Sequence, residues 1–301
     1  MSSIGNLFSL LSLKAFIPDP ADADYTMRSR LAKVRSVLVL TMGGAGVQGF
    51  RARLRGGGWK IEKGDGLEGP YLTPAILEHG RDIAQSNWVV LSFTPANLLC
   101  EMENGRLPDD AALQKALLNN PKSILRNRYE QDRRYQIIAS GDRRKYISFS
   151  VTTREITVLE KMIKDAGMEI ARIQIGLANM TELAIRRLEE ARKDGTKRVV
   201  LAGDQSIILS TSIRNGVWED PFSFISRTSV GGPADPNSVV EYLESLAAEI
   251  DEPGAEFHAI YSQPCWWIET VEQWFAERAS RYTLVKMEVP EYLPIHLAME
   301  G

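Results

Sequence analysis

The strongest constraint on this 301-residue chain is a pattern of elements that occurs twice along it. In each half, three stretches with the alternation of strands are followed by a helix, a strand, a second helix and a further strand. Roughly 40 residues separate the start of the first strand from the start of the first helix in both halves, the regularity that an internal duplication leaves. The sequence therefore predicts an α/β chain of two βββαβαβ units, with the first lobe at 34–196 and the second at 197–301.

Turn residues divide the first lobe into its elements. Glycines at 56–58 separate the second strand from the third, and Thr73 followed by Pro74 is typical of the start of a helix. An extra block at about 87–140 predicts an inserted small subdomain. The expected elements are strands at 34–44, 47–55, 59–65, 146–153 and 169–176 and helices at 73–85, 155–167 and 180–193.

The second lobe repeats the pattern around a strong hairpin signal. Asn215-Gly216 lies between two alternating stretches, and both residue types tolerate the left-handed backbone that a tight hairpin needs. The expected elements are strands at 197–204, 206–216, 217–228, 256–261 and 282–289 and helices at 237–250 and 268–279.

A glycine-rich motif follows the first strand. Residues 44–49 read Gly-Ala-Gly-Val-Gln-Gly and satisfy the G-x-G-x-x-G fingerprint of a dinucleotide site. That fingerprint requires a helix after the glycines, whereas residues 47–55 alternate largely as a strand does. We therefore predict a β-hairpin here, with the dinucleotide site as the alternative.

Five segments, in one order along the chain, resemble motifs of a known family. Residues 41–50 (TMGGAGVQGF) align with a first strand that in the family reads D-I-G-S-S-S-V-K-A-V, and 88–117 resembles its inserted subdomain. The stretch 147–184 resembles the part where a helix ends in Ala-Gly before a strand, 224–232 resembles F-x-R-x-I-x-x-G-G, and 292–301 resembles a closing G-L-A-x-x-G helix. The chain thus resembles PilM, the actin-like cytoplasmic protein of type IV pilus machines, and the cytoplasmic actin-like domain of GspL from type II secretion.

This resemblance implies a fold and a role. The expected fold is the two-lobed α/β fold of actin, hexokinase and Hsp70, with duplicated βββαβαβ units. The expected role is a non-catalytic cytoplasmic scaffold of a pilus or secretion platform, peripheral at the inner membrane through its partners. The implied partners are the cytoplasmic tail of a PilN-like or other bitopic inner-membrane protein and an assembly ATPase. Such a tail is expected to add to an exposed sheet edge or to fill a groove between the first domain and its insert.

Active members of the actin group hold Mg-ATP between two hairpins that each begin with Asp-x-Gly, and this chain departs from that pattern. Thr41 replaces the first aspartate, and a neutral hydroxyl does not supply the charge that holds a hydrated magnesium ion. The second aspartate falls at Ala202, with Asp204 two residues further on. Tryptophans stand where the adenosine loop would be glycine-rich. The candidate residues of this degenerate nucleotide cleft are Thr41, Gly43, Gly44, Gly203, Asp204, Gly231 and Gly232.

From these departures we expect no enzymatic activity, no catalytic residue, no metal and no cofactor. Turn glycines can still offer backbone N–H groups to a phosphate, so weak binding of ATP with magnesium is one alternative. A nucleotide-binding PilM-like ATPase is a second alternative, and a kinase of the same fold is a third.

Residues 1–33 precede the first lobe and are expected to form a helix and a linker. Apolar residues recur at helical spacing in 4–17, and Pro18 and Pro20 end the pattern. With the basic residues up to Arg35, this segment could bind a membrane surface. We favour a helix docked on the body of the protein or a frayed terminus, because so few basic residues make a weak anchor.

Composition limits the remaining function classes. A formal net charge of −3 argues against general nucleic-acid binding. We interpret the basic run at 122–145 as a solvated surface or a docking face for an acidic partner, with a nucleic-acid strip as the alternative. Cys100 and Cys265 lack metal or redox spacing, which favours a reducing compartment. Four aromatic residues near the end of the chain are interpreted as a core cluster, with a partner groove as the alternative. They are Trp266, Trp267, Trp274 and Phe275.

Overall fold

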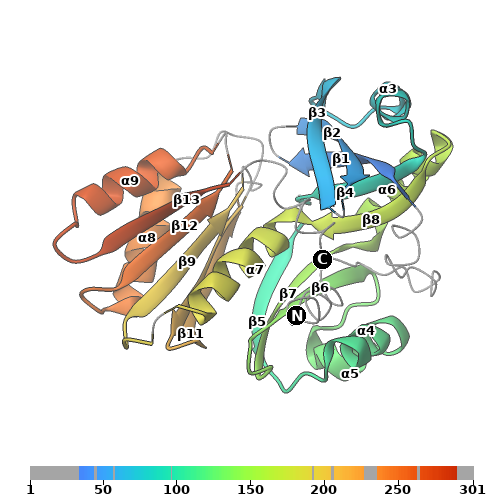
Figure 1. The fold of residues 1–301 in the computed structure, drawn as a ribbon. Coiled ribbons are helices and arrows are strands. Elements are labelled where there is room, and N and C mark those ends of the chain that lie inside the picture. Colours follow the sequence, from blue (N-terminus) through green and yellow to red (C-terminus); the bar gives the residue numbers. More distant parts are fainter. Residues whose placement is uncertain are drawn as a thin grey trace. The chain divides into compact units, whose positions relative to one another are not determined.

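The computed structural model describes residues 34–43, 46–56, 58–95, 97–191, 193–204, 207–226, 236–262 and 265–289. These residues divide into two compact units, and Figure 1 labels most of their elements. The first unit comprises 34–138 and 146–179, and the second comprises 139–145 and 180–289. Several predictions lie outside the described residues: those for 1–33, for Gly44, Gly231 and Gly232, and for the closing motif at 292–301.

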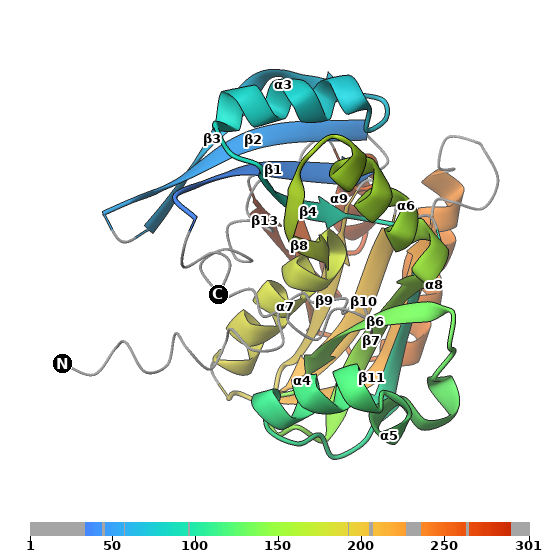
Figure 2. The same cartoon turned by 90° about the vertical axis from the view of Figure 1, so that its right-hand side faces the viewer.

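The first unit is built on a five-stranded mixed sheet. Its elements are β1 (Ser36–Gly43), β2 (Gly46–Arg55), β3 (Gly58–Gly69), α3 (Pro74–Ala84), β4 (Trp88–Phe93), α6 (Thr153–Asp165) and β8 (Glu169–Ile175). The strand order is β3-β2-β1-β4-β8, with β1 antiparallel to β2 and parallel to β4. Helix α3 packs along the three antiparallel strands, as Figure 2 shows.

Local sequence explains the first strand and the first helix of this unit. Residues 37–40 of β1 are fully buried, as expected for a central strand covered on both faces. Helix α3 begins at its predicted cap, where the Thr73 hydroxyl oxygen accepts a hydrogen bond of 3.3 Å from the Ile76 backbone N–H. Pro74 occupies the first turn, where its missing N–H costs nothing. The prediction of this capped helix is confirmed.

The second unit contains a five-stranded sheet with the same arrangement. Its elements are β9 (Lys197–Gly203), β10 (Ile207–Arg214), β11 (Val217–Ser226), α8 (Pro236–Ile250), β12 (Glu256–Tyr261), α9 (Ile268–Ala276) and β13 (Thr283–Glu288). The strand order is β11-β10-β9-β12-β13, with β9 antiparallel to β10 and parallel to β12. The predicted turn joins β10 to β11, and its residues Asn215 and Gly216 have φ values of 51° and 82°, the left-handed geometry of a two-residue hairpin loop.

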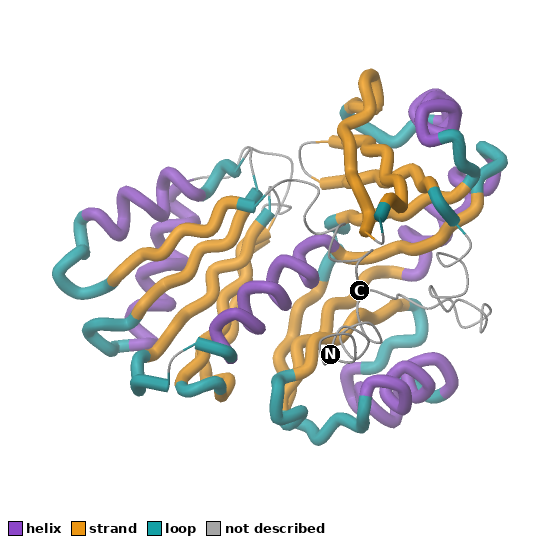
Figure 3. Tube along the Cα trace, in the orientation of Figure 1, coloured by secondary structure: helices purple, strands orange, loops and turns teal. Residues whose placement is uncertain are grey.

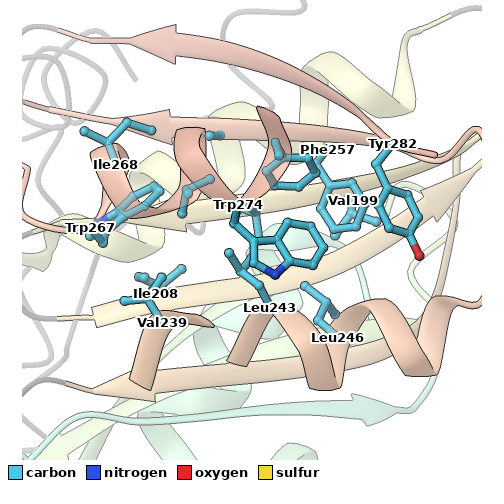
Figure 4. Packing of buried hydrophobic residues seen from close by; sticks show 14 of the residues in the cluster. Val199, Ile208, Val239, Leu243, Leu246, Phe257, Trp267, Ile268, Trp274 and Tyr282 are labelled. Atoms are coloured by element: carbon cyan, nitrogen blue, oxygen red, sulfur yellow. The ribbon is translucent and has the colours of Figure 1, made fainter. Parts of the chain in front are cut away.

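Helices α8 and α9 pack together and bury an aromatic cluster of the second unit, shown in Figure 4. The Trp274 ring contacts Phe275 and Tyr282, with centroids 4.8 and 6.0 Å apart. Trp267 is fully buried in the same cluster, and Trp266 packs against it half-buried. The interpretation of these tryptophans as core residues is therefore confirmed.

The two five-stranded sheets match strand for strand. In each, three antiparallel strands are followed by a helix, a strand parallel to the first strand, a second helix and a further parallel strand. This correspondence confirms the predicted duplication of a βββαβαβ unit.

The inserted subdomain is a three-stranded sheet with short helices, and its bounds correct the prediction. It comprises β5 (Leu99–Asn104), α4 (Asp110–Asn119), α5 (Lys122–Leu125), η1 (Arg126–Arg128), β6 (Arg133–Ala139) and β7 (Lys145–Thr152), with strand order β5-β7-β6 (Figure 3). The sequence pattern places 88–93 in the insert and 146–153 in the main sheet. In the structure the assignment is reversed: 88–93 forms β4 of the main sheet, and the second segment forms β7 of the insert. Both segments are buried apolar runs, so hydrophobic pattern alone does not distinguish them.

The division between the units falls inside α7 (Gly176–Glu189), between Asn179 and Met180, and thus ahead of the predicted boundary at 196/197. The end of this helix is held by the second unit. Glu189 accepts hydrogen bonds of 2.7 Å from Trp218 Nε1 and 2.8 Å from the Gly141 backbone N–H. These contacts explain why the last turns of α7 group with the strands that follow them.

The basic run at 122–145 contributes ion pairs to the first unit. Arg128 pairs with two glutamates of β5 at 2.9 Å, and Arg134, only 4% exposed, pairs with Glu160 at 2.9 Å. These pairs favour a structural role for part of the run, and the absence of a nucleic-acid partner stays a prediction. No helix within the described ranges is long and apolar enough to cross a membrane.

Candidate functional site

The hairpin of β1 and β2 holds Thr41 within the first sheet. In the strand register Thr41 lies opposite Gln48 on β2 and Ser92 on β4. Its hydroxyl donates to the Gln48 carbonyl oxygen at 3.4 Å, so it is used inside the hairpin. Gly43 ends β1 opposite Gly46, and a Cβ added at Gly43 would meet no atom within 4 Å. The predicted hairpin is confirmed, because a strand follows the glycine motif where a dinucleotide site needs a helix.

The turn between β9 and β10 uses Asp204 as a local cap. The Asp204 carboxylate accepts a hydrogen bond of 3.1 Å from the Ile207 backbone N–H, and the Asp204 backbone N–H donates to the Ile207 carbonyl oxygen at 3.1 Å. This pairing of an aspartate with a backbone group a few residues on is typical of turns. The carboxylate nearest to the expected second metal-holding position therefore has a structural function.

The indole of Trp267 lies directly against Gly203, the last residue of β9. A Cβ added at Gly203 would be 2.6 Å from Trp267 Cζ2 and 2.8 Å from its Nε1. The same Nε1 donates to the Asp204 carbonyl oxygen at 3.0 Å. Trp267 comes from the segment after β12, where the family resemblance implies the adenosine loop, and its side chain packs against Gly203 at the end of β9. Figure 4 shows the indole among the buried residues of the second unit.

The structure thus groups the described candidates in two pairs. Thr41 and Gly43 belong to the first unit, and Gly203 and Asp204 belong to the second. Among the residues that the structure describes, no group of three or more His, Cys, Asp or Glu side chains could hold a metal ion.

A groove of about 880 Å³ lies within the first unit, and we call it the hairpin groove. Its walls come from four places: the paired ends of β1 and β2, the segment 70–72 before α3, the end of β4 with the segment after it, and the start and one side of α6. Gly43, a candidate of the nucleotide cleft, is among its lining residues. The volume is within the range of about 300–1,000 Å³ that ligand pockets commonly have.

Gly46 brings two of these walls together. Its φ is 103°, and a Cβ there would lie 2.3 Å from the Gly69 carbonyl oxygen and 3.1 Å from Pro70 Cα. Only glycine combines that backbone angle with so close an approach. On the other side, the Thr94 backbone N–H donates to the Met42 carbonyl oxygen at 2.8 Å. The groove is therefore built on main-chain contacts.

The lining of the hairpin groove is mainly apolar and partly exposed. Tyr71 is 76% exposed and Val158 is 53% exposed, which is unusual for large apolar side chains on one small surface. The charged lining residues are Arg154 and Glu155 at the start of α6, and Met162 adds an adaptable side chain. This arrangement suits an apolar segment of another chain better than a phosphorylated ligand.

The sequence predicts a groove beside the insert but assigns it no residues. One signal is present in α6, where Val158 and Met162 widen the apolar stripe beyond the buried positions Ile156, Leu159 and Ile163. When the apolar stripe of an amphipathic helix is wider than the face it buries in its own core, part of that stripe stays exposed and can bind another chain. The contributions of the paired ends of β1 and β2 and of residues 70–72 depend on chain packing and leave no such signal.

No protein-family model matches the sequence, and no curated protein matches it. Among solved structures, the chain is similar to a Bacteroides thetaiotaomicron protein of unknown function with an actin-like ATPase fold, at 8% identity and a TM-score of 0.53. That alignment covers 90% of this chain and 98% of the other. Together with the duplicated sheets, this likeness shows that the chain has an actin-like fold.

Two further solved structures are similar to the chain. One is the PilM–PilN type IV pilus biogenesis complex, at 10% identity and a TM-score of 0.49, with 89% of this chain and 99% of the other covered. The second is the cytoplasmic domain of EpsL, an inner-membrane component of the type II secretion system of Vibrio cholerae, at 12% identity and a TM-score of 0.42, with 88% and 93% covered. At these identities the likeness concerns the fold alone.

Proposed function

We propose that this chain is a non-catalytic scaffold that holds an apolar peptide segment in the hairpin groove. The observation that carries the proposal is the groove itself, whose exposed apolar side chains lie within one unit of an actin-like fold. Following the sequence resemblance to the PilM family, the partner is the cytoplasmic tail of a PilN-like or other bitopic inner-membrane protein. The scaffold works in the cytoplasm at a pilus or secretion platform and reaches the membrane through that partner.

The energetics of such a contact favour a short apolar motif. Covering exposed apolar surface contributes about 25 cal/mol per Å², so a few side chains inserted between Tyr71 and Val158 supply most of the binding free energy. Arg154 and Glu155 at the groove can fix the direction of the bound segment by charge, because complementary charge contributes more to specificity than to affinity.

The same proposal assigns no reaction to the nucleotide cleft of the fold. Thr41 offers a hydroxyl where active members carry a carboxylate, and the Asp204 carboxylate caps its own turn. Trp267 packs against Gly203, where a phosphate would need close approach to the backbone. These residues do not fit magnesium-bound ATP, and coupling to an assembly ATPase would supply the platform's energy from another protein.

A matched pair of substitutions tests the groove. Val158 and Val217 are almost equally exposed, at 53% and 54%, but only Val158 lines the groove. We expect Val158→Lys to weaken binding of a synthetic tail peptide at least tenfold, about 1.4 kcal/mol, because its ammonium group would lose water in the complex. Val217→Lys is expected to leave the affinity within twofold. Fluorescence anisotropy with labelled peptides from candidate bitopic partners measures both.

The proposal would be contradicted if both variants bound the peptide with the same affinity as the unaltered protein. Equal loss in both variants would also contradict it, since Val217 lies at the start of β11 in the second unit. Circular dichroism of each variant confirms that a lost affinity does not come from a lost fold.

A further inference from the structure

A second, smaller pocket of about 430 Å³ lies within the inserted subdomain. It is bordered by the end of β5 with the segment that follows it, by α5 with η1, and by Tyr146 of β7. All of its lining residues belong to the first unit, and none of them lines the hairpin groove. The nucleotide cleft does not use this pocket either.

The pocket has an excess of positive charge. Its charged lining residues are Arg106, Arg126 and Arg128 against Glu103. Arg128 is neutralised, because its guanidinium pairs at 2.9 Å with Glu101 and with Glu103. Arg106 and Arg126 are exposed, and no ion pair or side-chain hydrogen bond joins either guanidinium to another residue in the described part of the chain. Two exposed arginines therefore line the pocket, and the Glu103 carboxylate beside them is paired with Arg128.

The backbone at Arg126 is in a conformation that ordinarily belongs to glycine. Its φ is 51° and its ψ is −117°, and its backbone N–H donates to the carbonyl oxygen of Lys122, the first residue of α5. A non-glycine residue in this region carries strain, and such residues concentrate at functional sites. The chain has an arginine at this position, although glycine would adopt the same backbone angles without strain.

The remaining lining suits a small polar ligand. Asn104, Gly105 and Asn127 are among its lining residues, and the Tyr146 hydroxyl donates to the Ile124 carbonyl oxygen at 3.3 Å. Amide groups and backbone suit hydroxyl groups of a ligand, whereas paired guanidinium groups suit a phosphate, which accepts two hydrogen bonds from each.

We propose that this pocket, with Arg106 and Arg126 as its anion-binding residues, is a binding site for a small phosphorylated organic molecule. The volume exceeds the needs of a bare phosphate and lies within the range of ligand pockets. The site is independent of the hairpin groove, so it stands whether or not a peptide binds there.

Two probes and three variants of the full chain test the site. Inorganic phosphate and glucose 6-phosphate are titrated at constant ionic strength, and backbone amide shifts of Gly105 and Asn127 report binding. We expect saturable shifts at both residues with millimolar or lower dissociation constants, and tighter binding of glucose 6-phosphate. Arg106→Gln and Arg126→Gly are expected to weaken both at least tenfold, while Lys115→Gln, an exposed cation on α4 outside the pocket, leaves them unchanged.

Arg126→Gly separates this site from a merely structural arginine. Because glycine accepts the backbone angles without strain, this variant is expected to melt at the same temperature as the unaltered protein or a higher one, while it loses phosphate binding. Shifts that do not saturate, or equal weakening by Lys115→Gln, would overturn the site. Binding of phosphate without glucose 6-phosphate would overturn the assignment of an organic ligand.

Discussion

Gly43 and Gly203 end the first strand of each duplicated sheet and have different surroundings. We expect Gly203→Ala to destabilise the protein by about 1–3 kcal/mol, because the added methyl group overlaps the buried indole of Trp267. Gly43→Ala meets open space and is expected to change the free energy of unfolding by less than about 0.5 kcal/mol. Urea unfolding of the two variants measures both values, and equal costs would contradict the packing described for Trp267.

Single residues also show where the sequence is informative. The sequence alone displays a hydroxyl at Thr41, where the family resemblance implies an aspartate, because residue identity decides that comparison. The capping function of Asp204 cannot be read from the sequence, because it depends on where the Ile207 backbone N–H lies in the fold. The contact of Trp267 with Gly203 joins positions far apart in sequence, and only the folded chain brings the indole to that turn.

Helix α3 has a cap whose contribution can be isolated. We expect Thr73→Ala to destabilise the protein by about 1 kcal/mol, because the Ile76 backbone N–H loses its acceptor. Thr73→Ser keeps the hydroxyl and is expected to cost no more than a few tenths of a kcal/mol. Thermal unfolding of the pair gives the difference, and a Ser variant as unstable as the Ala variant would indicate that the threonine methyl group, and not the cap, matters.

Elements that carry local signals are predictable, and elements defined by pairing are not. The hairpin at Asn215-Gly216 and the helix after Thr73 depend on turn and cap residues that the sequence displays. The exchange of β4 and β7 arises because two buried strands have the same apolar character and only their hydrogen-bonded neighbours separate them. The same reason leaves the walls of the hairpin groove without residue assignments.

Across the molecule, the duplicated actin-like plan is kept, whereas Thr41 and Asp204 form hydrogen bonds within their own hairpins. Within the first unit, the hairpin end that would approach a phosphate instead borders an apolar groove. Within the second unit, the end of β9 at Gly203 packs against the indole of Trp267. We infer that this chain uses an actin-like fold for binding a peptide and not for turning over a nucleotide.

Calorimetric titration of the full chain with ATP in the presence of magnesium tests that inference most directly. Because Thr41 carries a neutral hydroxyl, the Asp204 carboxylate caps its own turn and Trp267 packs against Gly203, we expect no saturable heat up to millimolar ATP, with or without magnesium. Magnesium-dependent binding with a micromolar dissociation constant would contradict it.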